Sequence, residues 1–177
     1  MMIAGRRKLL WYLSALLLLG YMMVHHVIQR VDVYGVSMEP EFVEGDVLFV
    51  NKLCRNFTEI ERFDAVVFQY EYRDHEYYIK RVIGLPGETV QIVDGKVYID
   101  GELLEDEYGT ELIEKPRRAA EPITLGEDEY FLLGDNRNDS SDSRDSDIGN
   151  VSDDQNNGTA GMKVWCGRYN CLPKFWR

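Results

Sequence analysis

The segment YYIKRVIG, Tyr77–Gly84, is built largely from aromatic and β-branched residues, a composition that favours a β-strand. Successive side chains of a strand point to opposite faces, so Tyr78, Lys80 and Val82 share one face. A lysine on this face is either a strand-edge residue whose ammonium group reaches water or an amine buried among apolar groups. The segment alone favours the first interpretation, and the rest of the chain has to decide between them.

Runs of the same kind flank this segment on both sides. They are DVLFV (Asp46–Val50), AVVFQYEY (Ala65–Tyr72), TVQIV (Thr89–Val93), KVYID (Lys96–Asp100), EYFLL (Glu129–Leu133) and MKVWCGRY (Met162–Tyr169). Asp94-Gly95 separates two of them and is a strong hairpin signal. Because no long helical period follows residue 30, the pattern predicts an all-β domain of several antiparallel sheets.

Two segments interrupt the strands. Residues 103–125 carry acidic and basic clusters with two prolines, which predicts an exposed insertion. Residues 136–160 are dominated by Asp, Asn, Ser and Gly, which is typical of a polar loop or flexible chain.

The N-terminal region predicts a membrane anchor. Leu9–Ile28 contains twenty residues without a formal charge, and a helix of about 20 residues crosses the hydrocarbon core of a bilayer. Arg6, Arg7 and Lys8 stand before it, so the positive-inside rule predicts a cytoplasmic segment 1–8, an anchor 9–28 and an extracytoplasmic domain 29–177. The alternative is a cleavable secretory signal. The apolar run is longer than the usual 7–15 residues, and no convincing small-x-small cleavage site follows it.

Composition and charge limit the partners. The 177 residues are 45% hydrophobic, which is enough for one anchor and one domain with a real core. Residues 1–30 hold four basic side chains and no acid, so the rest of the chain holds 16 basic and 31 acidic ones. A domain this acidic has no electrostatic surface for a phosphate backbone, and nucleic acid is not expected as a partner.

The three cysteines, Cys54, Cys166 and Cys171, form no CxxC pair, and the chain has only three histidines. A zinc site is therefore not expected, and neither is another metal or a cofactor. Cys166 and Cys171 can form a disulfide in an exported domain, and buried free thiols are an equal alternative.

The stretch GVSMEP, Gly35–Pro40, follows the predicted anchor and raises the question whether Ser37 is a turn residue or a nucleophile. His75 is the one histidine outside the anchor, and a histidine among acids at a hairpin tip favours a solvated surface residue. Lysine can replace histidine as the base when burial lowers its pKa, since a neutral amine can accept a serine proton. Lys80 is the candidate for this role.

A third segment, GDNRNDSSDSR at Gly134–Arg144, directly follows the strand Glu129–Leu133. It is either an acidic linker or a fixed network of Asp135, Arg137, Asp142 and Arg144 in which Ser140 hydrogen-bonds a buried amine. No frame supplies the ligands of an EF-hand calcium loop.

Four blocks of this chain together resemble the bacterial type I signal peptidases, membrane-bound serine proteases with a Ser-Lys dyad. They are G-x-S-M-x-P at Gly35–Pro40, GD-V-x-x-V at Gly45–Val50, YIKRVIGLPGE at Tyr78–Glu88 and GDNRxxSxDSR at Gly134–Arg144. The blocks stand in the family's order behind a single predicted anchor, and the resemblance covers nearly everything from the anchor through Arg144.

The resemblance implies a role for each matching residue. Ser37 is expected to be the nucleophile and Lys80 the general base, with Ser140 orienting the lysine amine. Asp142 is expected to pair with Arg144, and the same loop is expected to gain support from Asp135 and Arg137. The Ser37 N–H is expected to be one oxyanion donor. Some family members carry a serine hydroxyl two residues before the nucleophile, where this chain has Gly35.

The resemblance also implies the substrate and the location. The expected enzyme is a monomer in the bacterial cell membrane that cleaves pre-proteins after their signal peptides, with its catalytic domain outside. The expected walls of the substrate pockets are Val33, Tyr34, Met38, Tyr78 and Ile79, although these residues can equally pack the core. An extended substrate is expected to add as a strand beside the segments that carry Ser37 and Lys80. Candidates for contact with the lipid surface are Phe42, Phe49 and residues 172–176.

The chain departs from the family pattern at Glu41, at Glu88 and in residues 145–148, which bears on loop geometry and substrate preference. Two other functions remain open from the sequence. One is a non-catalytic, membrane-anchored β domain that binds peptides or cell-wall material. The other is a repressor-type Ser-Lys protease, against which the predicted anchor and the lack of a DNA-binding unit argue.

Overall fold

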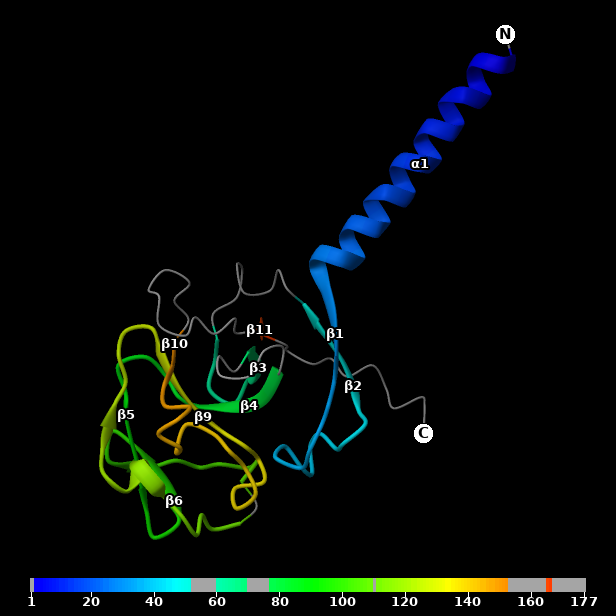
Figure 1. Ribbon diagram of the computed structural model, residues 1–177. Coiled ribbons are helices and arrows are strands. Elements are labelled where there is room, and N and C mark those ends of the chain that lie inside the picture. The colour runs from blue at the N-terminus through cyan, green and yellow to red at the C-terminus, as the bar shows by residue number, and fades with distance from the viewer. Residues whose placement is uncertain (1, 52–59, 70–76, 110, 153–164, 167–177) are drawn as a thin grey trace.

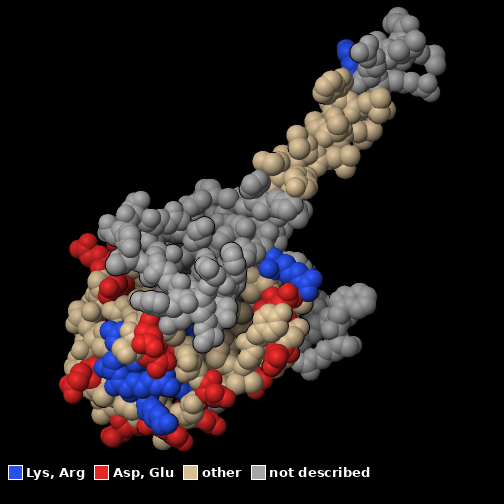
Figure 2. Space-filling view, in the orientation of Figure 1, with Lys and Arg blue, Asp and Glu red and all other residues tan. Residues whose placement is uncertain are grey.

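The computed structural model describes residues 2–51, 60–69, 77–109, 111–152 and 165–166. One long helix, α1 (Met2–Val27), leads into a β domain and projects away from it (Figure 1). Within the described residues, no helix is both long enough and apolar enough to be identified as membrane-spanning, so the predicted anchor is not confirmed. Figure 2 shows an almost uncharged surface on the described part of the helix, whereas acidic and basic groups are spread over the described part of the domain.

The described residues of the β domain form three antiparallel sheets. The first pairs β1 (Ile28–Asp32) with β2 (Val47–Asn51). The second has the order β10-β9-β4-β3-β11, formed by Val151–Ser152, Glu129–Leu133, Tyr77–Gly84, Ala65–Gln69 and Trp165–Cys166. The third has the order β7-β6-β5-β8, formed by Glu102–Leu103, Lys96–Ile99, Thr89–Val93 and Ile123–Thr124. The expected antiparallel, mainly β domain is confirmed.

The hairpin between β5 and β6 follows directly from its sequence. Val93 pairs with Lys96 in the register, and Asp94 and Gly95 between them have φ values of +50° and +76°. Two consecutive residues with positive φ form the type of turn that matches the twist of the strands, and Asp-Gly tolerates this conformation well.

Strand β4 lies in the middle of the second sheet, and its two sides differ. Along β3 the register is continuous from Tyr77↔Gln69 to Arg81↔Ala65. On the other side β9 begins to pair only at Arg81, so within the described part of the chain residues 77–80 pair with β3 alone. The edge of β4 next to Lys80 is therefore free of a described neighbouring strand.

The alternation predicted for β4 is found in the core. Val82 and the half-buried Tyr78 pack with Val66 and Phe68 of β3 in one cluster. Ile79 packs on the opposite side with Val67 and with residues of the first sheet and its connecting loop, among them Met38. Since Met38 follows Ser37 and Ile79 precedes Lys80, this shared cluster brings the nucleophile candidate and the base candidate together.

The expectation of an exposed insertion at residues 103–125 needs correction. Most of its charged side chains are exposed, but Ile113, Ala119 and Leu125 are buried in the core cluster beneath β5 and β6. A single turn of 3-10 helix, η2 (Arg117–Ala120), lies within the segment. The few apolar residues of this charged segment pack against the third sheet, and they hold the segment on the domain.

Candidate active site

Ser37 lies in the loop between β1 and β2, in a turn that the later part of the chain holds in place. Gly35 has a φ of +80°, in the left-handed region that favours glycine, and lets the chain turn before the serine. The main-chain N–H of Asn136 donates to the Ser37 carbonyl oxygen at 3.1 Å, and the Asn136 side-chain Nδ2 donates to the Val36 carbonyl at 3.2 Å. Asn136 therefore holds the turn that carries Ser37, the nucleophile candidate, through two hydrogen bonds.

Lys80 is buried, with 1% of its surface exposed. Its Nζ lies 2.8 Å from Ser37 Oγ and donates to the Ile79 carbonyl oxygen at 2.9 Å. Burial lowers the pKa of the Lys80 ammonium group from 10.5 to about 8, although the nearby carboxylates of Asp142 and Asp135 act in the opposite direction. In the neutral form of the amine, the same 2.8 Å contact allows the serine hydroxyl to donate to the nitrogen. The buried interpretation of Lys80 is thus confirmed, and the strand-edge interpretation is wrong.

Ser140 does not take the part expected of it. The described hydrogen bonds of Lys80 Nζ go to Ser37 and Ile79, and Ser140 Oγ is buried without a partner among the described residues. The hydroxyl still lies beside the nucleophile turn, because a Cβ atom placed on Gly134 would overlap both Ser140 Oγ and the Ser37 carbonyl oxygen. In this structure the carbonyl of Ile79 orients the amine instead.

The ion pairs of the loop 134–144 are buried and are only partly those that the sequence predicts. Asp142 and Arg144 form the expected pair, with two contacts of 2.8 Å, and Asp142 also accepts a hydrogen bond from the Gly134 N–H at 3.1 Å. Asp135 instead accepts two hydrogen bonds, of 2.7 and 2.5 Å, from Arg81 of β4, the residue next to Lys80.

Arg137 also pairs outside the loop. Its Nη2 donates to Asp106 in the segment after β7, and its Nε donates to the Gly134 carbonyl at 3.0 Å. The residues on both sides of Asn136 are therefore each fixed by a buried ion pair to another part of the domain.

Three residues of this arrangement were not assigned a role from the sequence. Arg81 adjoins Lys80 in a strand whose other residues are mostly apolar. A buried arginine needs an acidic partner, so its position was a signal for a buried ion pair. Asn136 belongs to the GDNR block but has a common loop residue type. Asp106 lies among many acids in residues 102–114, and nothing in the sequence separates it from its neighbours.

A groove of about 830 Å³ passes the two reactive side chains. All five predicted wall residues line it: Val33, Tyr34, Met38, Tyr78 and Ile79. Val33, Met38 and Ile79 also belong to the core cluster, whereas Tyr34 is 82% exposed, so the two interpretations of these residues are compatible. One wall of the groove follows β1 and its continuation, and the other contains residues 78–80 of β4.

The candidates for membrane contact are mostly outside the described residues. Residues 172–176 and the side chain of Phe49 lie outside them. Cys54 and Cys171, discussed as thiols or disulfide partners, and His75 also fall outside the described residues. Phe42 is 5% exposed and packs in the core, so its expected contact with the lipid surface is wrong.

Comparison with known proteins places these residues in a wider context. The family profile described as "Signal peptidase, peptidase S26" matches residues 6–165. Signal peptidase I V of Bacillus subtilis is 36% identical over 153 residues, which cover 78% of this chain and 89% of that protein. Signal peptidase I T of the same organism is 34% identical over 154 residues, covering 81% and 77%. A crystal structure of a signal peptidase I from Enterococcus faecalis matches with 34% identity and a TM-score of 0.44, over 54% of this chain and 91% of that one.

Proposed function

Because the chain belongs to the peptidase S26 family of signal peptidases and is a serine peptidase of the signal peptidase I type, we propose that it removes signal peptides from exported pre-proteins by a Ser-Lys acyl-enzyme mechanism. The observation that carries the mechanism is the 2.8 Å contact between Ser37 Oγ and the buried Nζ of Lys80. No metal or cofactor enters the proposal.

The reaction has two steps that use the same pair of residues. Neutral Lys80 accepts the proton of Ser37 as Oγ attacks the scissile carbonyl carbon, and the ammonium group then protonates the leaving amine. The signal peptide remains as an ester on Ser37. Lys80 next accepts a proton from water, the resulting hydroxide attacks the ester, and the proton returns to Ser37 Oγ as the acid product leaves.

The buried position of Lys80 supplies the base at neutral pH. With a pKa of about 8, roughly one lysine in ten is neutral at pH 7, compared with about one in three thousand at a pKa of 10.5. Burial thus raises the population of the reactive form by about two orders of magnitude. The carboxylates of Asp142 and Asp135 limit this lowering of the Lys80 pKa. Both carboxylates form ion pairs with arginines.

The Ser37 N–H is the proposed first donor to the oxyanion. Gly35 offers no hydroxyl as a second donor, and a Cβ atom at this position would have no other atom within 4 Å. The space beside Gly35 is therefore open to a water molecule or to the substrate's own groups.

The substrate is proposed to bind as an extended strand in the groove. Within the described part of the chain, β1 pairs only with β2, and residues 77–80 of β4 pair only with β3. Two strand edges without a further described neighbouring strand thus border the groove that holds the dyad, which suits the addition of a peptide strand. Val33 and Ile79, which line this groove, supply apolar wall for small side chains.

Membrane anchoring through residues 9–28 is part of the proposal. The support is the uncharged sequence of these residues, the basic cluster Arg6, Arg7 and Lys8 before them, and the exposed apolar surface of the described helix. An enzyme and a substrate that share one bilayer meet at a high effective concentration. This arrangement places the catalytic domain on the outer face of the bacterial cell membrane.

The test compares cleavage of a pre-protein by detergent-solubilised wild type, Ser37→Ala and Lys80→Ala, with Lys96→Ala as the control. Lys96 is an exposed lysine of β6, so its loss should leave the rate unchanged. We expect both dyad variants to lose at least about a thousandfold in rate. Equal cleavage by wild type and both dyad variants would exclude the mechanism and favour a non-catalytic peptide-binding domain.

A further inference from the structure

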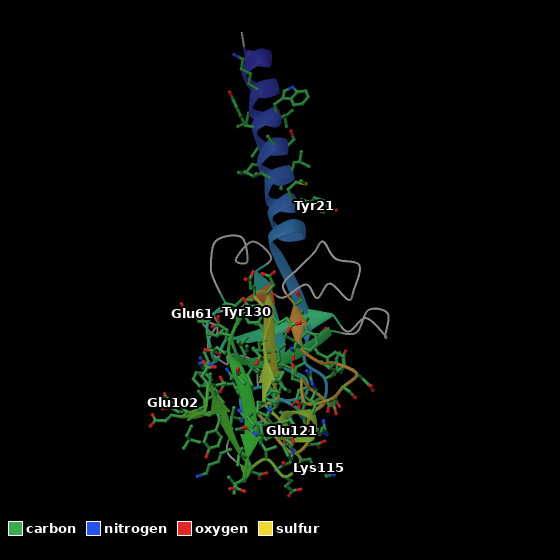
Figure 3. The ribbon with its side chains drawn as sticks, turned by 90° about the vertical axis from the view of Figure 1, so that its left-hand side faces the viewer. Tyr21, Glu61, Glu102, Lys115, Glu121 and Tyr130 are labelled. Atoms are coloured by element: carbon green, nitrogen blue, oxygen red, sulfur yellow. The ribbon has the colours of Figure 1, made fainter. Side chains whose placement is uncertain are left out.

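A second, smaller cavity of about 60 Å³ lies between the loop 134–144 and residues 114–117. Its lining contains four cationic side chains and one acid: Lys115, Arg117, Arg137, Arg144 and Glu114, together with Asn138. Arg117 and Asn138 also line the substrate groove, so the cavity adjoins it. Figure 3 shows Lys115 toward the end of the domain opposite α1.

Two of the cations are buried and have donors to spare. Arg137 and Arg144 are 4% and 2% exposed. Arg144 uses Nε and Nη2 for Asp142, and Arg137 uses Nε for Gly134 and Nη2 for Asp106. Neither Nη1 atom donates to a group in the described part of the chain.

These Nη1 atoms are also accessible. Among the described residues, the side-chain polar atoms that are both buried and unpaired are Ser140 Oγ and Asn150 Oδ1 alone. Each unpaired Nη1 therefore keeps some accessible surface, although that of Arg137 also lies close to Gly109, and the small cavity is a space that both arginines line. Guanidinium groups in this situation suit planar or tetrahedral oxyanions.

In the lining itself, cationic side chains outnumber acidic ones. The acids that neutralise the arginines, Asp106, Asp142 and Asp145, do not line the cavity. Lys115 forms no ion pair with any described residue, and Glu114 is the one acid in the lining. The cavity exceeds the roughly 10–15 Å³ that one water molecule needs, and is small enough to select a compact group.

We propose that this cavity is a binding site for a single oxyanion, supplied either by free phosphate or by a carboxylate of the peptide in the adjoining groove. Arg137 and Arg144 form the fixed part of the site, and Lys115 closes it from the solvent side. The site is separate from the dyad, so binding of phosphate does not depend on catalysis.

The first test measures binding of inorganic phosphate to the full chain in detergent by isothermal titration calorimetry, at constant ionic strength adjusted with sodium chloride. We expect saturable binding to wild type and to the inactive Ser37→Ala variant. Lys115→Gln should weaken the affinity about tenfold, the effect of one lost charged hydrogen bond, while Lys115→Arg retains it. Lys96→Gln, which removes an exposed lysine from β6, is the matched control and should bind as wild type does.

The second test identifies the source of the oxyanion. Pairs of peptide substrates that differ by one Glu→Gln exchange are cleaved by wild type and by Lys115→Gln. If the peptide supplies the carboxylate, Lys115→Gln cleaves one of the Glu peptides with a kcat/KM about tenfold lower than that of wild type. The matching Gln peptide is cleaved equally by both proteins. Phosphate then inhibits cleavage of that Glu peptide by wild type. If free phosphate is the ligand, only the calorimetric signal depends on Lys115. Phosphate heats no larger than those of chloride, together with peptide rates independent of Lys115, would overturn the proposal.

Discussion

The environment of Lys80 determines what its amine can do. The side chain lies on a strand face whose neighbours are Tyr78 and Val82, and its two hydrogen-bond partners are the Ser37 hydroxyl and the Ile79 carbonyl. Neither partner carries a negative charge, so neither compensates for the loss of water around an ammonium ion. The charged form is consequently disfavoured, and the base is available near neutral pH.

The pH dependence of cleavage follows from this environment. We expect kcat/KM to rise as pH increases through about 8, because the neutral amine is the active form and its fraction grows until the lysine is fully deprotonated. Rates with a short peptide substrate between pH 5.5 and 9.5 measure the effect. A flat profile down to pH 5.5 would contradict the assignment of Lys80 as the base.

The burial of Lys80 also lowers the stability of the folded domain. The pKa of Lys80 is lower in the folded chain than in the unfolded one, so the folded state carries the full penalty below about pH 8, and stability rises between about pH 8 and 10.5. Lys80→Met removes the penalty, and we expect it to stabilise the domain at pH 7 by roughly 1–3 kcal/mol. Denaturant unfolding at pH 7 and pH 10.5 tests this. The advantage should shrink at the higher pH, and equal gains at both would point to better packing instead.

Asn136 holds the turn that carries the proposed nucleophile, Ser37. Its side chain holds the Val36 carbonyl at 3.2 Å, next to Ser37. We expect Asn136→Ala to lower kcat about tenfold with little change in KM, because the turn of Ser37 loses one of its two hydrogen bonds from Asn136 while the groove remains. Asn150→Ala, which removes a comparable hydrogen bond to Glu129, serves as the control in steady-state assays. A change confined to KM would assign Asn136 to substrate binding.

At the scale of elements, β4 connects the base with the support of the nucleophile. Lys80 and Arg81 are consecutive residues of the strand and point to opposite faces. Arg81 binds Asp135, and its guanidinium carbon lies 3.5 Å from the centre of the Tyr108 ring, so the strand also fixes the start of the loop 134–144. The position of Ser37 thus depends on β4 through Asp135 and Asn136.

The buried pair of Arg81 and Asp135 should be far more sensitive than an exposed pair. Asp135→Asn leaves the Arg81 charge buried without its counterion, and we expect a loss of about 3 kcal/mol in the free energy of unfolding. Asp32 pairs with Arg30 at 2.7 Å on the surface, and Asp32→Asn should change stability by less than about 0.5 kcal/mol. Urea unfolding of the two variants provides the comparison. An equally small loss in both variants would mean that Arg81 finds another partner when Asp135 is replaced.

The elements also show what the sequence reveals and what it does not. The strands from β2 to β6 and β9 follow from runs of β-branched and aromatic residues, and the hairpin at Asp94-Gly95 follows from its turn chemistry. Asp106 could not be chosen among its acidic neighbours, because its pairing with Arg137 depends on how two distant loops pack. Ile113, Ala119 and Leu125 show no period, so their burial beneath the third sheet was equally hidden.

At the scale of the whole molecule, charge separates the two parts of the chain. The acids lie in the β domain, whereas residues 9–28 have no formal charge. This separation suits a protein with one part in lipid and the other in water.

The proposed anchor can be tested by placing charge within it. Leu16 and Leu17 are exposed on the helix, and we expect Leu16→Glu combined with Leu17→Glu to move the protein from the membrane to the soluble fraction after alkaline carbonate extraction. Leu16→Ala combined with Leu17→Ala is the control and should remain in the membrane fraction. Retention of the charged variant would locate the attachment elsewhere in the chain.

The clasp of Asn136 on the turn of Ser37 has a consequence for the order of synthesis. The nucleophile and the base are made early, 43 residues apart, but the residue that holds the nucleophile is about 100 positions beyond it. A growing chain that has not yet reached residue 144 has the reactive groups without the frame that aligns them. If the proposed mechanism holds, we expect proteolytic activity to arise only after Asn136 and the loop 134–144 have been made and folded.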